Sequence, residues 1–323
     1  MIKLFTHTDL DGVGCAIVGI LAFGKSNIEV EYCGYETIDQ KVVEFFKQKD
    51  IKEYDAIFIT DISVSEKVAK MINSIAPDRV VLLDHHATAE GLNEYSWANV
   101  IATEPNKKER RNQLTSGTSL FFNYLNDQGL IQMDDFELDE AAEFVEKVRR
   151  YDSWEWKNVY GDYDAKELND LFFLIGLYKF ADRFASKCSI NLNKTEKTLL
   201  EVERKRVDYY LKTKRRELIK RDWWANEVEE FHIGVVFCEQ YHSEVGNVLA
   251  DENPDCDFIV LVTPGGKKLS FRRNEKSDVH LGEIAKLFKD DNGRAGGGHS
   301  PAAGASFKSE QLEGVLDLIL GVL

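Results

Sequence analysis

The sequence predicts an α/β protein with two domains and a mostly parallel sheet in its N-terminal half. Short apolar segments alternate there with amphipathic ones, a pattern typical of parallel strands joined by helices on both faces of a sheet. The last hundred residues or so change to closely spaced strand-like segments, which indicates a smaller α/β domain. With 323 residues, the chain is also longer than one ordinary hydrophobic core requires.

The N-terminal half has four candidate strands, each a short apolar segment, at residues 2–5, 28–32, 56–60 and 80–83. Helical periodicity of apolar residues predicts helices at 12–23, 39–49, 65–75 and 139–150. The Ser/Thr-rich segment 115–119 is most simply a helix cap, because hydroxyl groups satisfy the free amides of a first turn. The same amides and Gly117 leave direct contact with a phosphate as an alternative.

A charged helical connector is predicted at about 191–221, where neither glycine nor proline occurs. From 194 to 221 it carries 11 basic and five acidic residues. This charge is most simply a solvated face, and the alternative is a rim that attracts an anionic ligand. The predicted domain boundaries are therefore a catalytic domain at 1–190, a helical linker at 191–225 and a second domain at 226–323.

The second domain has candidate strands at 231–238, 258–263 and 268–271, with a Pro-Gly-Gly turn between the last two. A helix is predicted at 279–288. The segment 296–304, Gly-Gly-Gly-His-Ser-Pro-Ala-Ala-Gly, is too rich in glycine for a helix interior.

Composition excludes several classes of protein. The net charge of −15 argues against non-specific binding of long nucleic acid, which depends on many phosphate contacts, but it allows a small phosphorylated substrate. The segments are too short for a membrane span or a signal peptide, so we expect no membrane contact and a cytoplasmic protein. The five scattered cysteines form no C-x-x-C pair and are expected to be free thiols.

Residues with metal-ligand chemistry follow three of the predicted parallel strands. The first strand is followed by Asp9 and Asp11, and the third by Asp61. The fourth strand, a run of four branched apolar residues, ends in Asp84-His85-His86. Because the carboxyl ends of parallel strands meet at one edge of a sheet, we expect these side chains to lie together, where a ligand usually binds. So many carboxylates would repel one another without cations, so the pattern indicates a metal-dependent hydrolase.

A pair of aspartates is a weak signal alone, and Asp61 or Asp152 alone would be read as a helix cap. The combination is stronger. Six candidate ligands are enough for two metal ions that share a bridging carboxylate: His7, Asp9, Asp11, Asp61, His85 and Asp152. The histidines favour manganese over magnesium alone. In this hypothesis Asp61 bridges the metals, Asp84 orients a histidine, and His86 donates to a phosphoryl oxygen or the leaving group.

The C-terminal half offers candidate phosphate contacts. Gly297 and Gly298 allow close approach of the backbone, and His299 follows them directly. Arg272 lies at a predicted strand end, where a guanidinium suits a phosphate. These residues predict a second module that holds the phosphate of a substrate.

Taken together, the motifs resemble those of the DHH phosphoesterase superfamily. His7-Thr8-Asp9-Leu10-Asp11-Gly12 resembles motif I, Asp61 motif II, Asp84-His85-His86 motif III and Asp152 motif IV. The glycine-rich segment resembles the C-terminal domain associated with that superfamily. Many members have three residues between the first histidine and the aspartate pair, whereas here only Thr8 intervenes. The resemblance implies two manganese ions, with magnesium or cobalt possible, and a substrate bound in the cleft between the two domains.

Within this superfamily the chain is most similar to the small soluble branch of nanoRNases. Pyrophosphatases carry a different C-terminal domain, RecJ-type exonucleases are larger, and membrane-bound cyclic-dinucleotide phosphodiesterases have transmembrane regions. The resemblance implies an oligoribonuclease that degrades short RNA oligonucleotides to mononucleotides, and a homodimer is possible. The alternatives are a 3'-phosphoadenosine 5'-phosphate phosphatase, a linear or cyclic dinucleotide phosphodiesterase, and a nucleotide sensor without hydrolytic activity.

Overall fold

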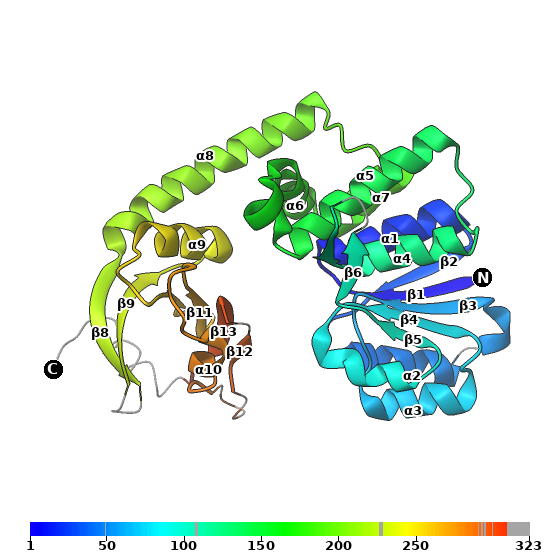
Figure 1. Ribbon diagram of the computed structural model, residues 1–323, viewed down its shortest axis with the longest axis horizontal. Coiled ribbons are helices and arrows are strands. Elements are labelled where there is room, and N and C mark those ends of the chain that lie inside the picture. The colour runs from blue at the N-terminus through cyan, green and yellow to red at the C-terminus, as the bar shows by residue number, and fades with distance from the viewer. Residues whose placement is uncertain are drawn as a thin grey trace. The chain divides into compact units, whose positions relative to one another are not determined.

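The structure is a computed structural model, and it describes residues 1–48, 50–106, 109–225, 229–289, 291, 293, 295–298 and 300–308. The chain forms two compact units, Met1–Leu200 (unit 1) and Glu201–Leu323 (unit 2) (Figure 1). Each unit has its own sheet and its own buried core.

Within the described residues, unit 1 is built on a five-stranded sheet in which every neighbouring pair is parallel. The order across the sheet is β2 (Ile28–Tyr32), β1 (Ile2–Thr6), β3 (Ala56–Thr60), β4 (Val80–Asp84) and β5 (Ala98–Val100). The chain leaves β1 towards one edge to form β2, and then returns to the other side of β1 to form β3. In open α/β sheets, ligands bind at the carboxyl ends of the strands where the order reverses in this way.

Helices cover both faces of this sheet, as predicted (Figure 1). On one face the apolar side chains of the sheet pack against α1 (Leu10–Phe23), α4 (Gly117–Asp127), α5 (Asp135–Asp152), α6 (Tyr163–Ile175) and α7 (Leu177–Ser186). On the other face they pack against α2 (Ile38–Gln48) and α3 (Glu66–Ile75). The central strands β1, β3 and β4 are buried on both faces, which is why they are almost continuously apolar in the sequence.

Shorter elements connect these layers. They are η1 (Ile51–Glu53) before β3, η2 (Ala87–Glu94) after the Asp-His-His segment, the hairpin of β6 (Thr103–Asn106) and β7 (Arg111–Leu114), and the π-helical turn η3 (Trp156–Tyr160). The sequence did not predict the hairpin, because both of its strands are polar and lack β-branched runs.

The predicted connector is the long helix α8 (Lys194–Glu217). The prediction of a linker reaching residue 225 was wrong at its C-terminal end, because β8 (Ile219–Ala225) is the edge strand of the unit 2 sheet. Alternate residues of β8 face the sheet, a period of two that the basic composition of this segment masks.

Among its described residues, unit 2 contains a six-stranded mixed sheet. The order is β12 (Gly297–Gly298), β13 (Ala302–Ser306), β11 (Lys268–Arg272), β10 (Phe258–Thr263), β9 (Glu229–Phe237) and β8. The pair β9 and β10 is parallel, and the other pairs are antiparallel. The two faces pack against α10 (Leu281–Ala285) and α9 (His242–Glu252), so this unit is also α/β, as predicted.

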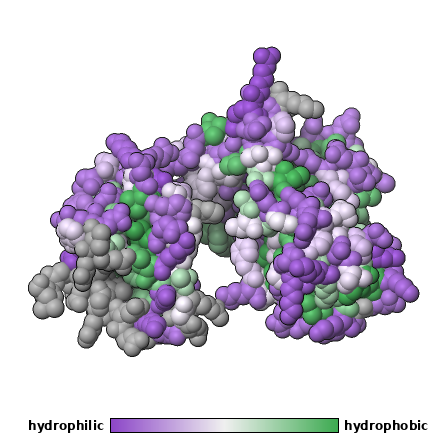
Figure 2. Space-filling view, turned by 60° about the horizontal axis from the view of Figure 1, so that its bottom comes forward, coloured by the Kyte–Doolittle hydropathy of each residue, from purple (hydrophilic) through white to green (hydrophobic). Residues whose placement is uncertain are grey.

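Several expectations about the surface and the thiols can be compared with the structure. All five cysteines are free and buried, as predicted. No helix in the described part of the chain is long and apolar enough to cross a membrane. Hydrophilic residues cover most of the face seen in Figure 2, with hydrophobic residues in separate patches.

Candidate active site

The carboxyl edge of the unit 1 sheet collects most of the predicted ligands. His7, Asp9 and Asp11 follow β1, and Asp61 follows β3. Asp84 is the last residue of β4, and His85 and His86 come directly after it. The last predicted ligand, Asp152, ends helix α5. These are the strand ends at the β1/β3 reversal, where such a sheet usually binds its ligand.

His7 and Asp9 form the first part of the site. Nδ1 of His7 lies 2.8 Å from Oδ2 of Asp9 and 3.9 Å from Oδ2 of Asp61. Asp9 is also the N-cap of α1, where its Oδ1 accepts a hydrogen bond of 3.0 Å from the amide of Gly12. The sheet edge and the first turn of α1 therefore fix this carboxylate from two sides.

Asp11 is buried and bound to the start of a helix far along the chain. Its carboxylate accepts hydrogen bonds from the amides of Gly117 (2.6 Å) and Thr118 (2.9 Å) at the N-terminus of α4. The Thr118 hydroxyl donates to the Asp11 carbonyl at 2.6 Å. The Ser/Thr-rich segment thus caps a helix, through Ser116 and Ser119, and the amides that could have contacted phosphate are bonded to Asp11 instead.

Asp61 lies at the centre of the site and is buried. Its backbone is left-handed, with φ 58°. A Cβ placed on Gly117 would lie 2.3 Å from the Asp61 Cβ, so only glycine allows this approach of α4. Oδ2 of Asp61 accepts no hydrogen bond from any residue that the structure describes. Asp61 was considered as a possible cap of α3, but Ser65 holds that position.

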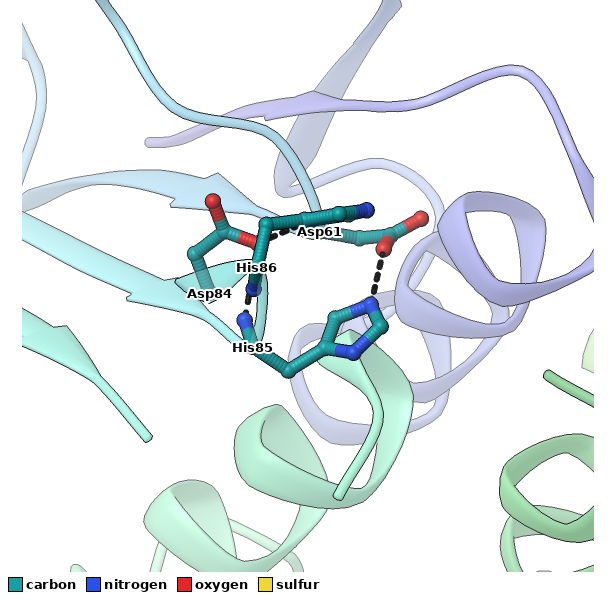
Figure 3. A group of neighbouring side chains, drawn as sticks. All are labelled: Asp61, Asp84, His85 and His86. Carbon is teal, nitrogen blue, oxygen red and sulfur yellow. Dashed lines mark hydrogen bonds and ion pairs between the residues drawn. The ribbon is translucent and has the colours of Figure 1, made fainter. Parts of the chain in front are cut away.

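The ring of His85 points into the carboxylates. Its Nε2 lies 3.2 Å from Oδ1 of Asp61, and Figure 3 shows this contact. The same nitrogen is 3.5 Å from Asp152 and 3.7 Å from Asp11, in each case measured to Oδ2. His85 therefore brings together predicted ligands from the first turn of α1, the segment after β3 and the end of α5.

Asp84 belongs to a different hydrogen-bond network, next to His86 (Figure 3). Its Oδ1 lies 2.7 Å from Nδ1 of His86, and its Oδ2 accepts a hydrogen bond of 2.5 Å from the Ser63 hydroxyl. On the other side of the ring, Nε2 of His86 lies 3.1 Å from the hydroxyl of Tyr35. Both nitrogens of His86 are therefore held.

The carboxylates of the site differ in the direction in which their pKa values are shifted. Burial, together with the charges of Asp11 and Asp9, raises the pKa of Asp61 and of Asp152 well above their usual range. Burial opposes ionisation of Asp84 as well, but hydrogen bonds from His86 and Ser63 outweigh it and lower its pKa. For His86, the bond to Asp84 outweighs burial and raises the pKa.

A lowered pKa keeps Asp84 ionised, so its carboxylate accepts a hydrogen bond from the Nδ1–H of His86, and Nε2 is the ring nitrogen on the side of Tyr35. The raised pKa of Asp61 and Asp152 has a different cause, namely burial and the like charges of neighbouring aspartates, which divalent cations would offset.

Three overlapping groups could each hold a cation, because their donor atoms lie within 4.8 Å of one another. They are His7, Asp9 and Asp61; Asp11, His85 and Asp152; and Asp61, Asp84, His85 and His86. All six predicted metal ligands occur in these groups. Asp61 is shared by two of them, in keeping with a bridging carboxylate.

The predicted phosphate contacts lie in unit 2. Arg272 ends β11, and its half-buried guanidinium passes α9 at Gly246, where a Cβ would lie 2.6 Å from the Arg272 Cγ. Its Nε is buried and makes no hydrogen bond with the described residues. Gly297 and Gly298 form the exposed strand β12, and a Cβ at Gly298 would clash with Ala303. His299 lies outside the described residues.

The sequence did not single out Tyr35, Ser63 or Thr118 as part of the site. Tyr35 follows β2 at the same carboxyl edge, so the strand-end rule would have included it had β2 been treated like its neighbours. The contact between Thr118 and Asp11 spans 107 residues and has no signal in local spacing.

Comparison with known proteins identifies the family. The chain is 37% identical over 320 residues to the oligoribonuclease NrnB of Bacillus subtilis, covering 97% of this chain and 74% of that protein. This chain belongs to the DHH phosphoesterase family. Residues 239–323 also match the family model of the DHHA1 domain. As a DHH phosphoesterase, the protein is a hydrolase of phosphoester bonds.

Solved structures support the fold. A pGpG-specific phosphodiesterase, PggH from Vibrio cholerae, is similar with a TM-score of 0.54 at 15% identity, covering 99% of this chain and 98% of that one. An exonuclease RecJ bound to manganese has a TM-score of 0.54 at 12% identity, covering 97% of this chain and 87% of that one. These likenesses show that the DHH phosphoesterase fold extends over nearly the whole chain.

Proposed function

We propose that this DHH phosphoesterase hydrolyses very short RNA oligonucleotides to mononucleotides, with two divalent cations, manganese in preference, at the carboxyl edge of the unit 1 sheet. The convergence of four carboxylates and two imidazoles at that edge carries the proposal. The RNA substrate is suggested by the Bacillus relative, which is named an oligoribonuclease. The net charge of −15 favours a short substrate over a long strand.

The donor set fits divalent cations. Carboxylates and imidazoles are ligands that manganese accepts, and the buried Oδ2 of Asp61 has no hydrogen-bond donor in the part of the chain that the structure describes. In this proposal His7, Asp9 and Asp61 would hold one cation, Asp11, His85 and Asp152 would hold the other, and Asp61 would serve both. When bound, the cations would offset the charge of the phosphate and acidify the water that attacks phosphorus.

The remaining residues of the site orient the substrate. Asp84 keeps the proton on Nδ1 of His86, and Nε2 is then the atom we assign to a phosphoryl oxygen or to the leaving oxygen. The N-terminus of α4 fixes Asp11 so that the carboxylate cannot turn away when substrate binds. In unit 2, we assign Arg272, Gly297, Gly298 and His299 to phosphate contacts, and we expect Arg272→Ala to weaken substrate binding rather than metal binding.

The test is hydrolysis of a 5'-labelled RNA dinucleotide, a five-mer and a twenty-four-mer, with 3'-phosphoadenosine 5'-phosphate alongside. Each is incubated with manganese, with magnesium and with chelator. We expect manganese-dependent release of mononucleotides from the two short RNAs and slow turnover of the long one.

A matched pair of variants controls for general damage. Asp61→Asn should abolish the activity, whereas Asp55→Asn should preserve it, because Asp55 pairs with the N-terminal amine at the opposite edge of the sheet. Preference for the twenty-four-mer would contradict the proposal, and turnover of the bisphosphate alone would make the protein a nucleotide phosphatase. Tight nucleotide binding without turnover would make it a sensor.

A further inference from the structure

The loop between β2 and α2 places one aromatic residue, Tyr35, in the site. Tyr35 lies in a tight turn in which Gly34 accepts hydrogen bonds from the amides of Thr37 (2.9 Å) and Ile38 (3.0 Å). The turn is bound to the sheet by Cys33, whose amide donates to the carbonyl of Thr6 at 2.7 Å. The backbone that carries Tyr35 is therefore fixed to the same edge as the metal ligands.

The side chain of Tyr35 is also held, yet it stays open to solvent. Its hydroxyl contacts Nε2 of His86 at 3.1 Å, and its ring centroid lies 4.8 Å from that of His7. The ring of His86 meets it edge-on at 6.0 Å. Despite these contacts, 60% of Tyr35 remains exposed. The contacts with His7 and His86 therefore hold the ring beside the predicted metal ligands and leave much of its surface available to a ligand.

We infer that Tyr35 is a stacking platform for a nucleobase of the substrate, the base of a nucleotide next to the scissile phosphate. The inference rests on the proposed function, because it requires a nucleotide at the site. Tyr35 touches the histidine assigned to the phosphoryl group, so a base that stacks on it belongs to a nucleotide bound there. Stacking is indifferent to charge, and it supplies affinity that a strongly acidic chain does not gain from long-range attraction.

Two functions of Tyr35 must be separated, since its hydroxyl also positions His86. Tyr35→Phe removes the hydroxyl and keeps the ring, whereas Tyr35→Leu removes both. Tyr54→Phe is the matched control, because it removes a tyrosine hydroxyl that bonds to Glu29 (2.9 Å) at the amino edge of the same sheet. The substrates are an RNA dinucleotide and two analogues, each lacking one of the two bases.

Base stacking on an aromatic residue contributes about 1–3 kcal/mol, so Tyr35→Leu should lower kcat/KM for the dinucleotide by roughly 5- to 150-fold. Tyr35→Phe should retain most of the activity, and Tyr54→Phe all of it. On the analogue that lacks the stacked base, Tyr35→Phe and Tyr35→Leu should be nearly equal, because both lack the hydroxyl and the base that the ring would contact is already absent.

Two results would overturn the inference. If Tyr35→Phe is as impaired as Tyr35→Leu, the hydroxyl matters and the ring does not. If Tyr35→Leu lowers kcat/KM by the same factor on the dinucleotide and on both analogues, Tyr35 supports the arrangement of the site and does not contact a base. Calorimetric binding of the same ligands, with calcium replacing manganese, repeats the comparison without turnover. An inactive wild type would therefore count against the oligoribonuclease function, while the stacking contact would still be decided by affinity.

Discussion

Asp61 has a left-handed backbone conformation that few residues other than glycine adopt. Its φ of 58° is tolerated best by asparagine and aspartate among residues with a side chain. Gly117 approaches it so closely that a side chain there would clash. Strained backbone of this kind persists where function requires it. Asparagine is therefore the substitution that tests the carboxylate without disturbing the fold.

We predict that Asp61→Asn is inactive but more stable than wild type in chelator at neutral pH. The pKa of Asp61 is raised by burial and by neighbouring carboxylates, so its ionised form destabilises the folded state, and the variant removes that charge. Loss of a residue that only hydrogen-bonds to a metal ligand typically lowers activity or metal affinity by about 10–100-fold. Loss of Asp61, the proposed shared ligand, should therefore lower activity by more than about 100-fold. Thermal unfolding in chelator and turnover with manganese are the two measurements.

Asp55→Asn serves as the control, with no gain in stability and no loss of turnover. An Asp61→Asn protein that unfolds at a lower temperature than wild type in chelator would mean that the cluster is not under electrostatic strain.

Hydrogen bonds from a buried arginine hold the C-terminal end of α5 and so position Asp152. Arg149, only 1% exposed, lies one turn before it. Its guanidinium donates to Glu155 (2.5 Å), to Glu146 (2.7 Å) and to the carbonyl of Leu114 in β7 (2.8 Å). One side chain therefore joins α5, the turn before η3 and the β6–β7 hairpin.

We expect Arg149→Met to destabilise unit 1 by roughly 3 kcal/mol, because it leaves buried carboxylates with fewer partners. In a unit of this size, that corresponds to a fall of about 6–12 °C in Tm. The apparent affinity for manganese should fall as well, since Asp152 loses its fixed position. Tm and a metal titration of the variant measure both effects.

The comparison is Lys205→Met, which breaks an exposed ion pair with Glu201 and should change the free energy of unfolding by no more than about 1 kcal/mol. If the two variants had the same Tm, the buried network would have no role in holding the end of α5.

Elements with a strong apolar period could be predicted from the sequence, and polar or short ones could not. The strands β1, β3 and β4 are buried on both faces, so their composition alone reveals them. By contrast, β13 consists of small residues, and α9 contains Gly246 and follows an N-cap residue, Tyr241, whose side chain makes no capping hydrogen bond. Neither the apolar period nor the capping rule applies to them.

The residues of the site also divide into those whose positions could be predicted from the sequence and those whose positions could not. The positions of Asp61 and Asp84 follow from strand ends, because parallel strands bring their carboxyl ends together. The hydrogen bonds that fix Asp11 come from the distant helix α4, and the end of α5 before Asp152 is bound through Arg149 to a polar hairpin, so both depend on tertiary packing that local patterns do not encode.

For the whole protein, we predict that stabilisation by manganese grows as the pH rises through the raised pKa values of Asp61 and Asp152. Asp61 and Asp152 have raised pKa values, so the folded metal-free protein binds more protons than the unfolded chain. Their contribution to stability is complete below the ordinary pKa of 3.8 and is lost as the pH rises through their folded pKa. Cations compete with those protons and restore the loss.

The measurement is the difference in Tm between manganese and chelator across this pH range, with unfolding of the two units followed separately by hydrogen exchange. Protection should increase in unit 1 around Asp9, Asp61 and His85. A Tm difference that does not change with pH would mean that the raised pKa values are not linked to the cation site.

The hydrogen bond between Asp11 and the amide of Gly117 joins residues 106 positions apart. Closing so long a loop costs chain entropy, so this contact is expected to form late, after the sheet and its neighbouring helices have packed. A ligand set completed so late cannot guide folding. Cations that bind there would slow unfolding and leave the refolding rate unchanged. During biosynthesis the chain would thus fold without metal and bind it afterwards. Its activity in a cell would therefore depend on the concentration of available metal and not on the rate of translation.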